Sequence, residues 1–261
     1  MRLPIKLIAL DLDGTLLDSN DNISSNTNLK LKELIERGIH IVIATGRTYR
    51  SANNVQNRLS LNVPIISYNG AKISLPSKVD IIDKKISKYE AKKILEYAET
   101  NDIFVKAYID DVMYINDEDE HSIKLSYRHG IQYKVIGRLS ENINEDVNMI
   151  VIRNRDRNEF SIDGLFDDLN VSITKSVPYI YEFMAKGSSK GDSLKTLSKH
   201  LGVKREEILA VGNALNDLEM LQFAGTGIAM KNSDPELLEI WDNLSYYTNN
   251  EEGVYQIIKD I

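Results

Sequence analysis

The chain contains no cysteine among its 261 residues. Disulfide bonds, thiolate metal sites and a cysteine nucleophile are therefore excluded. A chain without disulfide bonds also suits a reducing compartment, so we expect a cytoplasmic location.

Positive charge is also scarce. Lys and Arg total 32 against 39 Asp and Glu, which gives a net charge of −7. General nucleic-acid-binding proteins usually present a basic face, so we expect no nucleic-acid partner. A phosphorylated ligand is not excluded, because a local cationic site can exist on an acidic protein.

Long hydrophobic runs are missing as well. The apolar stretch near the N-terminus ends at Asp11, which makes it too short for a signal peptide, and no run reaches the length of a membrane span. Hydrophobic residues make up 42% and charged residues 27% of the chain, as in ordinary globular proteins. We expect no membrane association and either one large domain or two modest ones.

The first 70 residues alternate between strand-like and helix-like patterns. Lys6–Leu10 and Ile39–Ala44 are short apolar runs typical of buried strands, and Asn28–Arg37 has apolar residues at helical spacing. This alternation, which returns from Lys190 onward, predicts an α/β fold with a doubly wound, Rossmann-like parallel sheet.

The middle of the chain follows a different pattern. Strand-like runs succeed one another as in hairpins, with predicted helices at Lys88–Asn101, Glu118–Arg128 and Asn158–Leu169. We therefore predict an α+β unit at residues 80–185, inserted into a discontinuous core made of residues 1–79 and 186–261.

Four predicted strands of the core end in polar turns, and open parallel sheets bind ligands at this edge. Asp11 and Asp13 lie one residue apart after the first strand, so their charges require a compensating cation. Mg²⁺ prefers oxygen ligands, and Lys190 would add a second positive charge. The four turns are Asp11-Leu12-Asp13-Gly14-Thr15, Thr45-Gly46-Arg47, Tyr68-Asn69-Gly70 and Gly212-Asn213-Ala214-Leu215-Asn216-Asp217.

Four motifs now occur in a recognisable order. "DLDGTLLD", "ATGR", "SSKGDSL" and "GNALNDLEML" resemble the motifs of haloacid dehalogenase-type phosphatases. The chain is most similar to the Cof-type branch, in which an α/β cap is inserted between the second and third motifs. The spacing agrees with that branch, because the segment between Asp13 and Thr45 is too short for a cap, whereas the segment between Thr45 and Lys190 has ample room.

The resemblance implies a role for each matching residue. Asp11 would be the nucleophile that forms an aspartyl-phosphate, and Asp13 the general acid that later activates water. The phosphoryl group would be held by the Thr45 hydroxyl, the Gly46 amide, the Lys190 ammonium and Asn216. Such positioning and charge neutralisation are the main sources of catalysis in phosphoryl transfer.

The resemblance also implies a Mg²⁺ cofactor, with Mn²⁺ as the alternative metal. Its ligands would be Asp11, Asp13 through its backbone carbonyl, Asn213 and Asp217, the last of which would otherwise orient Lys190. The fourth motif of the family usually carries Asp where this chain has Asn213. An amide oxygen brings no charge, so we expect a lower metal affinity.

The predicted activity is hydrolysis of small phosphorylated metabolites, either sugar phosphates, nucleotides or cofactor phosphates, by a monomer or homodimer. The alternatives are a phosphomutase or phosphotransferase, and a phospho-ligand-binding regulatory protein weakened by Asn213. Arg47 is expected only to cap its turn. The four histidines lack metal-site spacing and are expected to be structural or at the surface, whereas Tyr108, Tyr114 and Tyr181 are candidates for a substrate pocket.

Overall fold

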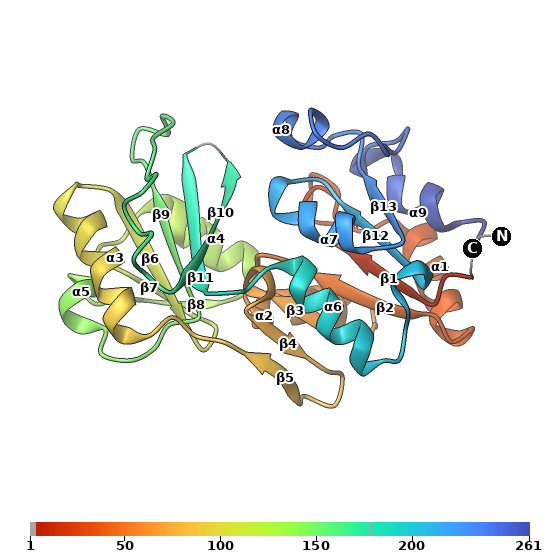
Figure 1. Cartoon of the computed structure of the whole chain (residues 1–261), viewed down its shortest axis with the longest axis horizontal. Helices are drawn as coiled ribbons and strands as arrows, with labels where there is room; N and C mark the ends of the chain where they lie inside the picture. The colour runs from red at the N-terminus through yellow and green to blue at the C-terminus, as the bar shows by residue number, and fades with distance from the viewer. Residues whose placement is uncertain (1–3, 178) are drawn as a thin grey trace.

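The computed structural model describes residues 4–177 and 179–261, and it contains two units, each built around its own sheet (Figure 1). The larger sheet has the strand order β13-β12-β1-β2-β3-β4-β5. Strands β13 to β3 run parallel in this order, and β4 and β5 add antiparallel neighbours at one edge. The strands are β1 (Leu7–Leu10), β2 (His40–Ala44), β3 (Ile65–Ser67), β4 (Lys72–Ser74), β5 (Asp80–Asp83), β12 (Ile208–Gly212) and β13 (Thr226–Ala229).

Helices cover both faces of the larger sheet, as the doubly wound prediction requires. Ile8 and Leu10 of β1 pack with one group of helices, and Leu7 and Ala9 with the other. All four side chains are fully buried, so the apolar run at the start of the chain forms the centre of the core. The first group is α1 (Ser25–Glu36), α2 (Tyr49–Arg58) and α9 (Gly253–Ile258), and the second is α6 (Lys190–His200), α7 (Leu218–Phe223) and α8 (Pro235–Leu238).

The smaller sheet has the order β10-β11-β9-β6-β7-β8 and is mostly antiparallel. Its apolar residues alternate between two faces, so one face packs on α3 and α5 while the other faces α4 and the larger unit. The elements are α3 (Lys88–Thr100), β6 (Phe104–Ile109), β7 (Val112–Ile115), α4 (Glu120–His129), β8 (Gln132–Val135), α5 (Leu139–Asn142), β9 (Met149–Arg153), β10 (Val171–Val177) and β11 (Ile180–Ala185). We call the two units the core unit and the cap unit.

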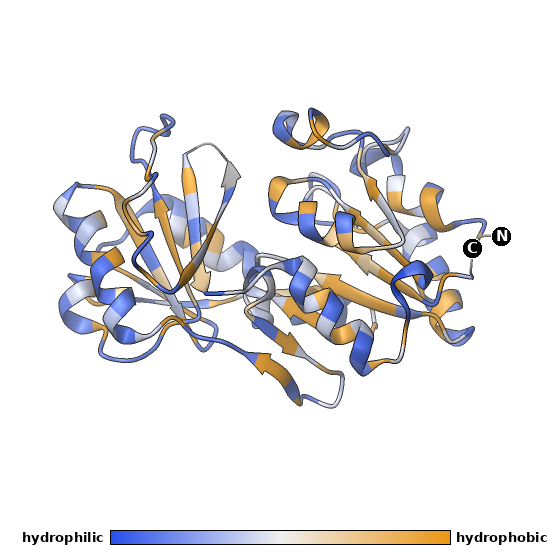
Figure 2. Cartoon of the chain, viewed as in Figure 1, coloured by the Kyte–Doolittle hydropathy of each residue, from blue (hydrophilic) through white to orange (hydrophobic). Residues whose placement is uncertain are grey.

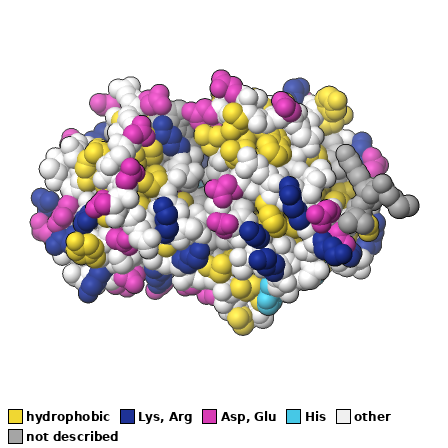
Figure 3. Space-filling model, in the orientation of Figure 1, with side chains coloured by type: hydrophobic (Ala, Val, Ile, Leu, Met, Phe, Trp, Pro, Cys, Tyr) yellow, Lys and Arg dark blue, Asp and Glu magenta, His cyan; other side chains and the backbone are white. Residues whose placement is uncertain are grey.

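Hydropathy follows this layering (Figure 2): the strands are predominantly apolar and the helices have polar outer sides. On the face seen in Figure 3, Lys and Arg side chains are interspersed with Asp and Glu side chains. No helix in the described part of the chain is both long and apolar enough to cross a membrane.

Two predictions differ from the structure. The segment predicted as a helix at Asn158–Leu169 forms a series of turns instead, because Gly164 adopts a left-handed backbone with φ of 75°. The predicted boundary at residue 80 coincides with the start of β5, which pairs with β4 in the larger sheet. We therefore infer that the insertion begins nearer Lys84, and the domain boundaries otherwise stay a prediction.

Candidate active site

The ends of β1, β2 and β12 meet at one edge of the core sheet. The backbone amide of Asp11 donates to Val211 of β12 at 3.0 Å, and that of Thr45 donates to Ile66 of β3 at 2.8 Å. A cavity of about 510 Å³ opens over these strand ends, between the core unit and the cap unit. Its core-unit wall includes Asp11, Asp13, Gly14, Thr45, Gly46, Arg47, Asn213 and Asn216.

Lys190 joins two carboxylates next to this wall, and of the three residues only Asp11 lines the cavity. Its Nζ lies 2.8 Å from Asp11 Oδ1 and 2.7 Å from Asp217 Oδ1, and all three side chains are at least nine-tenths buried. Burial raises the pKa of Asp11 to about 7, although the charge of Lys190 opposes this rise. Burial disfavours the charged form of Lys190, but Asp11 and Asp217 outweigh it and hold the lysine pKa above its ordinary value.

Asp217 uses both of its carboxylate oxygens. Its Oδ2 accepts hydrogen bonds from the backbone amides of Asn213 at 2.9 Å and Ala214 at 3.1 Å. A Cβ at Gly212 would lie 2.5 Å from this carboxylate, so only glycine fits there. Asp217 therefore contacts both Lys190 and the backbone of the loop after β12.

Asp13 is bound by an arginine that the sequence analysis left out of the site. Arg47 donates from Nε to Asp13 Oδ2 at 2.7 Å and from Nη2 to Asp13 Oδ1 at 2.5 Å. Burial raises the pKa of Asp13, but the hydrogen bonds and charge of Arg47 outweigh it, so the pKa lies below its ordinary value. Arg47 therefore does more than cap its turn. In the sequence it directly follows Thr45-Gly46 at the same strand end, and this position indicates that it belongs to the site.

The same arginine connects the two units. Arg47 Nη2 also lies 3.1 Å from Asp21, and Asp21 pairs with Arg128 of α4 at 2.5 Å. Arg128 in turn lies 3.6 Å from Asp13. A core arginine and a cap arginine therefore share the carboxylates of Asp13 and Asp21, which holds the cap unit against the cavity.

Asn213 lies where the sequence predicts a metal ligand. One atom of its side-chain amide is 2.8 Å from the Asp13 carbonyl oxygen, 2.9 Å from Thr15 Oγ1 and 3.1 Å from Asp11 Oδ2. The carbonyl and the ionised carboxylate only accept hydrogen bonds, so we assign this atom as the amide nitrogen. Asn213 then donates to the same oxygens that would bind a cation.

The donor set fits a hard divalent cation by chemistry. One carboxylate oxygen, one backbone carbonyl and one amide oxygen would be available once the Asn213 amide turns over. Only Asp11 would contribute a charged ligand atom, because Asp13 would bind through its backbone carbonyl and Asn213 through a neutral amide, and Lys190 already offsets the charge of Asp11. Within residues 4–177 and 179–261, no three His, Asp or Glu side chains cluster as a metal site. The set thus suits Mg²⁺ but with little protein charge.

Three of the predicted phosphate-binding residues, Thr45, Gly46 and Asn216, also line the cavity, whereas Lys190 does not. Thr45 is buried, and its Oγ1 accepts a hydrogen bond from the Arg47 amide at 3.1 Å. Gly46 lies close to Asn69, because a Cβ at Gly46 would be 2.9 Å from Asn69 Oδ1. Asn216 donates to Asn69 at 3.1 Å, while its own Oδ1 is buried without a partner in the described structure. The free atom of Asn216 in this orientation is an oxygen, which accepts hydrogen bonds. Phosphoryl oxygens need donors, so this oxygen could not bind them directly.

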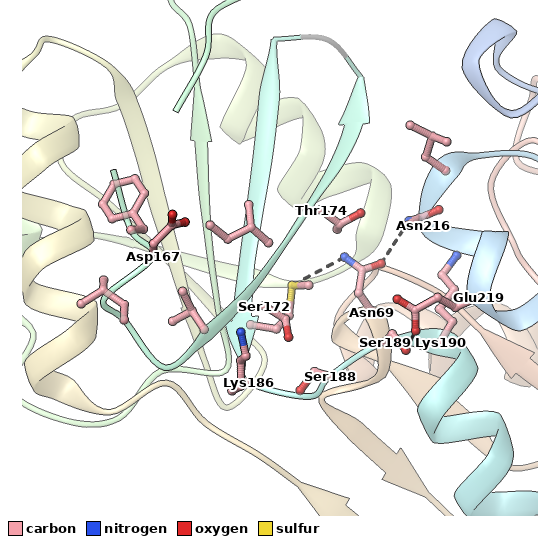
Figure 4. Close-up of a pocket in the computed structure, with 16 residues that line it drawn as sticks. Asn69, Asp167, Ser172, Thr174, Lys186, Ser188, Ser189, Lys190, Asn216 and Glu219 are labelled. Carbon is pink, nitrogen blue, oxygen red and sulfur yellow. Dashed lines mark hydrogen bonds between the residues drawn. The ribbon is translucent and has the colours of Figure 1, made fainter. Parts of the chain in front are cut away.

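A second cavity, of about 550 Å³, lies on the other side of Asn69 and Asn216. Figure 4 shows the side chains of these two residues pointing toward each other, with Asn69 also reaching Met184 of β11. Asn69 additionally donates to Glu182 of β11 at 2.5 Å. Lys190 lines this second cavity but Asp11 and Asp13 do not, so we place the chemistry in the first one.

The cap-unit wall of the first cavity includes two histidines and a tyrosine. His121 and His129 both line it, and the expectation that the histidines are structural or at the surface stays a prediction. Burial, aided by the charge of Arg47, lowers the pKa of His129 to about 3. Tyr108 lines the wall as expected. Tyr181 instead bonds to the Phe160 carbonyl, and Tyr114 packs on the cap core.

Comparison with known proteins agrees with this arrangement. Residues 8–258 match the family of haloacid dehalogenase-like hydrolases. The 5-amino-6-(5-phospho-D-ribitylamino)uracil phosphatase YitU of Bacillus subtilis (strain 168) is 33% identical, over 97% of this chain and 96% of that protein. The crystal structure of TM0651 from Thermotoga maritima has 32% identity and a TM-score of 0.83, covering 98% and 97% of the two chains. A haloacid dehalogenase-like hydrolase from B. subtilis has 26% identity and a TM-score of 0.87, covering 98% and 100%.

The chain therefore belongs to the haloacid dehalogenase-like hydrolase family and is a phosphatase of its Cof-type branch. The family, predicted from the four motifs, and the fold class, predicted from the alternation of strands and helices, are confirmed. The roles of the individual site residues stay predictions.

Proposed function

We propose that the protein hydrolyses phosphate monoesters of small metabolites through an aspartyl-phosphate on Asp11, with Mg²⁺ as cofactor. The observation that carries this proposal is the buried Asp11–Lys190–Asp217 chain, of which Asp11 lines the cavity. Lys190 fixes one oxygen of Asp11, which orients the carboxylate and stabilises its ionised form.

In the first step, a carboxylate oxygen of Asp11 attacks phosphorus and the bond from phosphorus to the leaving alcohol breaks. Asp13 donates a proton to that alcohol. In the second step, Asp13 removes a proton from water, the water oxygen attacks phosphorus, and the bond to Asp11 breaks. Free phosphate and the original Asp11 carboxylate result. Lys190 and the donors around Thr45 and Gly46 neutralise and hold the phosphoryl oxygens.

The proton transfers require Asp13 to leave Arg47. While both hydrogen bonds from Arg47 are in place, Asp13 is held ionised and cannot act as an acid. Arg47 has a second carboxylate within reach, because Asp21 lies 3.1 Å away. We propose that substrate binding moves Arg47 from Asp13 toward Asp21 or the phosphoryl group, which frees Asp13 to take up a proton.

Asp11, the Asp13 carbonyl and Asn213 would hold the cation, which when bound would offset negative charge on the phosphoryl group. Asn213 must give up the hydrogen bonds from its amide to offer its oxygen. We do not include Asp217 among these ligands, since both of its oxygens are engaged.

The substrate of the 33%-identical relative, 5-amino-6-(5-phospho-D-ribitylamino)uracil, is one candidate for this chain. Sugar phosphates, nucleotides and other cofactor phosphates are further candidates. The cytoplasmic location and the monomeric or dimeric state stay predictions from the sequence.

The test is release of free phosphate from an aryl phosphate, with and without Mg²⁺, by the wild type and by Asp11→Asn. We expect metal-dependent turnover that falls by about 10⁴-fold or more in Asp11→Asn. Turnover that survives this substitution would refute Asp11 as the nucleophile. Phosphoryl transfer to an added sugar in place of free phosphate would identify a phosphotransferase.

The hydrogen bonds of Asn213 favour a second candidate, a phospho-ligand-binding protein with weak catalysis. That candidate predicts phosphate binding with negligible turnover in the wild type and a gain of turnover in Asn213→Asp. The same phosphate-release assay separates the two functions.

A further inference from the structure

Lys106 is a buried cation on the cap-unit wall of the active-site cavity. It lies on β6, whose residues Val105 and Ala107 face the cap core, so Lys106 projects from the opposite face of the strand. That face is turned toward the core unit, and Lys106 lines the cavity that contains Asp11 and Asp13. Only 7% of its surface is exposed.

In the described parts of the chain, no acidic side chain lies within 4 Å of the Lys106 ammonium. Its Nζ lies 5.6 Å from the centre of the Tyr108 ring, a contact that offsets only part of the cost of burying a charge. Asp11 and Asp13 are paired with Lys190 and Arg47. Glu182 lines the same cavity from two strands away, a backbone spacing of about 10 Å, and it accepts a hydrogen bond from Asn69 of the core unit at 2.5 Å.

A second polar atom near Lys106 also has no partner. Nδ1 of His121, which lines the same wall, is buried without a hydrogen bond in the described structure. Burial and the charge of Lys106 lower the pKa of His121, so the imidazole is neutral and offers a hydrogen bond without adding charge. The same wall also contains His129, Glu182 and four apolar side chains, those of Leu125, Met149, Val151 and Ile180.

We propose that Lys106, with His121 beside it, binds an anionic oxygen group on the leaving part of the substrate. The substrate class is then a phosphate monoester whose alcohol carries a second anion, either a carboxylate or a second phosphate. The transferred phosphoryl group occupies the core-unit wall, and the second anion replaces the missing partner of Lys106. This inference rests on the proposed function, which determines where the substrate lies in the cavity. It adds the chemical group that the cap unit selects in the substrate.

Binding tests the proposal independently of catalysis. In the Asp11→Asn background, dissociation constants are measured by calorimetry for 6-phosphogluconate and glucitol 6-phosphate, which differ only in a carboxylate against a hydroxymethyl group. Fructose 1,6-bisphosphate and fructose 1-phosphate form the second pair. We expect at least one anionic ligand to bind about ten- to a hundredfold more tightly than its neutral match. The pair with the larger ratio identifies carboxylate or phosphate as the second anion.

Adding Lys106→Met should reduce that ratio to about one, whereas Lys106→Arg should retain most of it. Lys134→Met is the matched control, because Lys134 is a cap lysine that stacks on Tyr114 and is exposed. It should leave the ratio unchanged. Ratios near one in the starting protein, or ratios that Lys106→Met does not alter, would overturn the proposal.

Steady-state kinetics on the otherwise unaltered enzyme separate this proposal from the phosphatase function itself. Lys106→Met should raise KM for the anionic substrate and leave kcat/KM for the neutral substrate and for an aryl phosphate within about twofold. If no phosphate ester is hydrolysed, the proposed function fails while the binding ratios still decide the role of Lys106. If Lys106→Met lowers kcat/KM equally for neutral and anionic substrates, Lys106 has a structural role and the proposed anion subsite is refuted.

Discussion

The two walls of the active-site cavity differ in how their charges are satisfied. On the core-unit wall, Arg47 contacts two carboxylates, and Lys190, which lies next to this wall, contacts Asp11 of the wall and Asp217, so each cation already has protein partners. On the cap-unit wall, Lys106 has an aromatic ring and no acid in the described structure. A wall with fixed internal pairing is suited to one invariant group, the phosphoryl group. A wall with an unpaired cation leaves its partner to be supplied by the variable part of a substrate.

The largest test of this comparison makes the same substitution on both walls. Lys190→Met should lower kcat for an aryl phosphate by about 10²- to 10³-fold, because it removes the cation nearest to Asp11. Lys106→Met should leave that kcat within about twofold, since an aryl phosphate has no second anion. Circular dichroism must show that Lys190→Met, which leaves two buried carboxylates, still folds. Similar losses in both variants would remove the distinction between the walls.

The sequence predicts the core-unit wall well for a physical reason. Parallel strands end at one edge of a sheet, so polar turns after several strands meet in space even when they are far apart in the chain. Asp11, Thr45 and Asn213 were located in this way, and all three line the cavity. Arg47 was missed because its role depends on the distance to Asp13, which only the folded strand order sets.

The cap-unit wall could not be predicted in the same way. Lys106 is one lysine in an otherwise apolar strand, and the sequence does not indicate whether such a side chain faces solvent or a cavity. Its position becomes informative only when the cap unit is seen to place that face over the core. The predicted helix at 158–169 failed for a local reason, because apolar spacing at Ile162, Phe166 and Leu169 suggested a helix that Gly164 interrupts.

The next test changes the charge of the core-unit wall by one substitution. Asn213→Asp should tighten Mg²⁺ binding by about tenfold or more, because it replaces hydrogen-bond donors facing Asp11 and the Asp13 carbonyl with a charged ligand. Calorimetric titration with Mg²⁺ and the rise in melting temperature on adding Mg²⁺ both measure this without an assay of activity. Asn57→Asp, which adds the same charge at an exposed helix position, is the control. An unchanged dissociation constant would show that Asn213 does not face the cation.

A smaller effect is expected from breaking the contact between Arg47 and Asp13. Arg47 lowers the pKa of Asp13, so Arg47→Met should raise it. Because Asp13 must be protonated to release an alcohol, activity toward an alkyl phosphate should persist to higher pH in the variant. The measurement is the pH at which kcat/KM falls on the alkaline side of its profile. Asp21→Asn, which removes the other partner of Arg47, should not raise that pH. If Arg47→Met leaves it unchanged, Asp13 does not set the alkaline fall.

The smallest effect concerns stability, and its sign follows from the raised pKa of Asp11. Burial raises this pKa from 3.8 to about 7, so the folded chain holds the proton more tightly than the unfolded chain and loses stability as pH rises between those values. Asp11→Asn lacks that loss of stability. Without added metal, its melting temperature relative to that of the wild type should therefore rise between pH 5 and pH 8, by on the order of 2–4 °C.

Other groups titrate in the same interval, and the comparison of variant with wild type cancels them. His129, with a pKa of about 3 in the folded chain, makes both proteins more stable as pH rises. Asp13 has a lowered pKa, so its contribution changes only at more acidic pH. Asp156→Asn, which makes the same substitution at an exposed position, is the control. A constant difference between Asp11→Asn and the wild type would mean that Lys190 keeps Asp11 ionised throughout. The core-unit wall would then be charged before any substrate arrives, and the contrast with the unpaired cation of the cap unit would be sharper still.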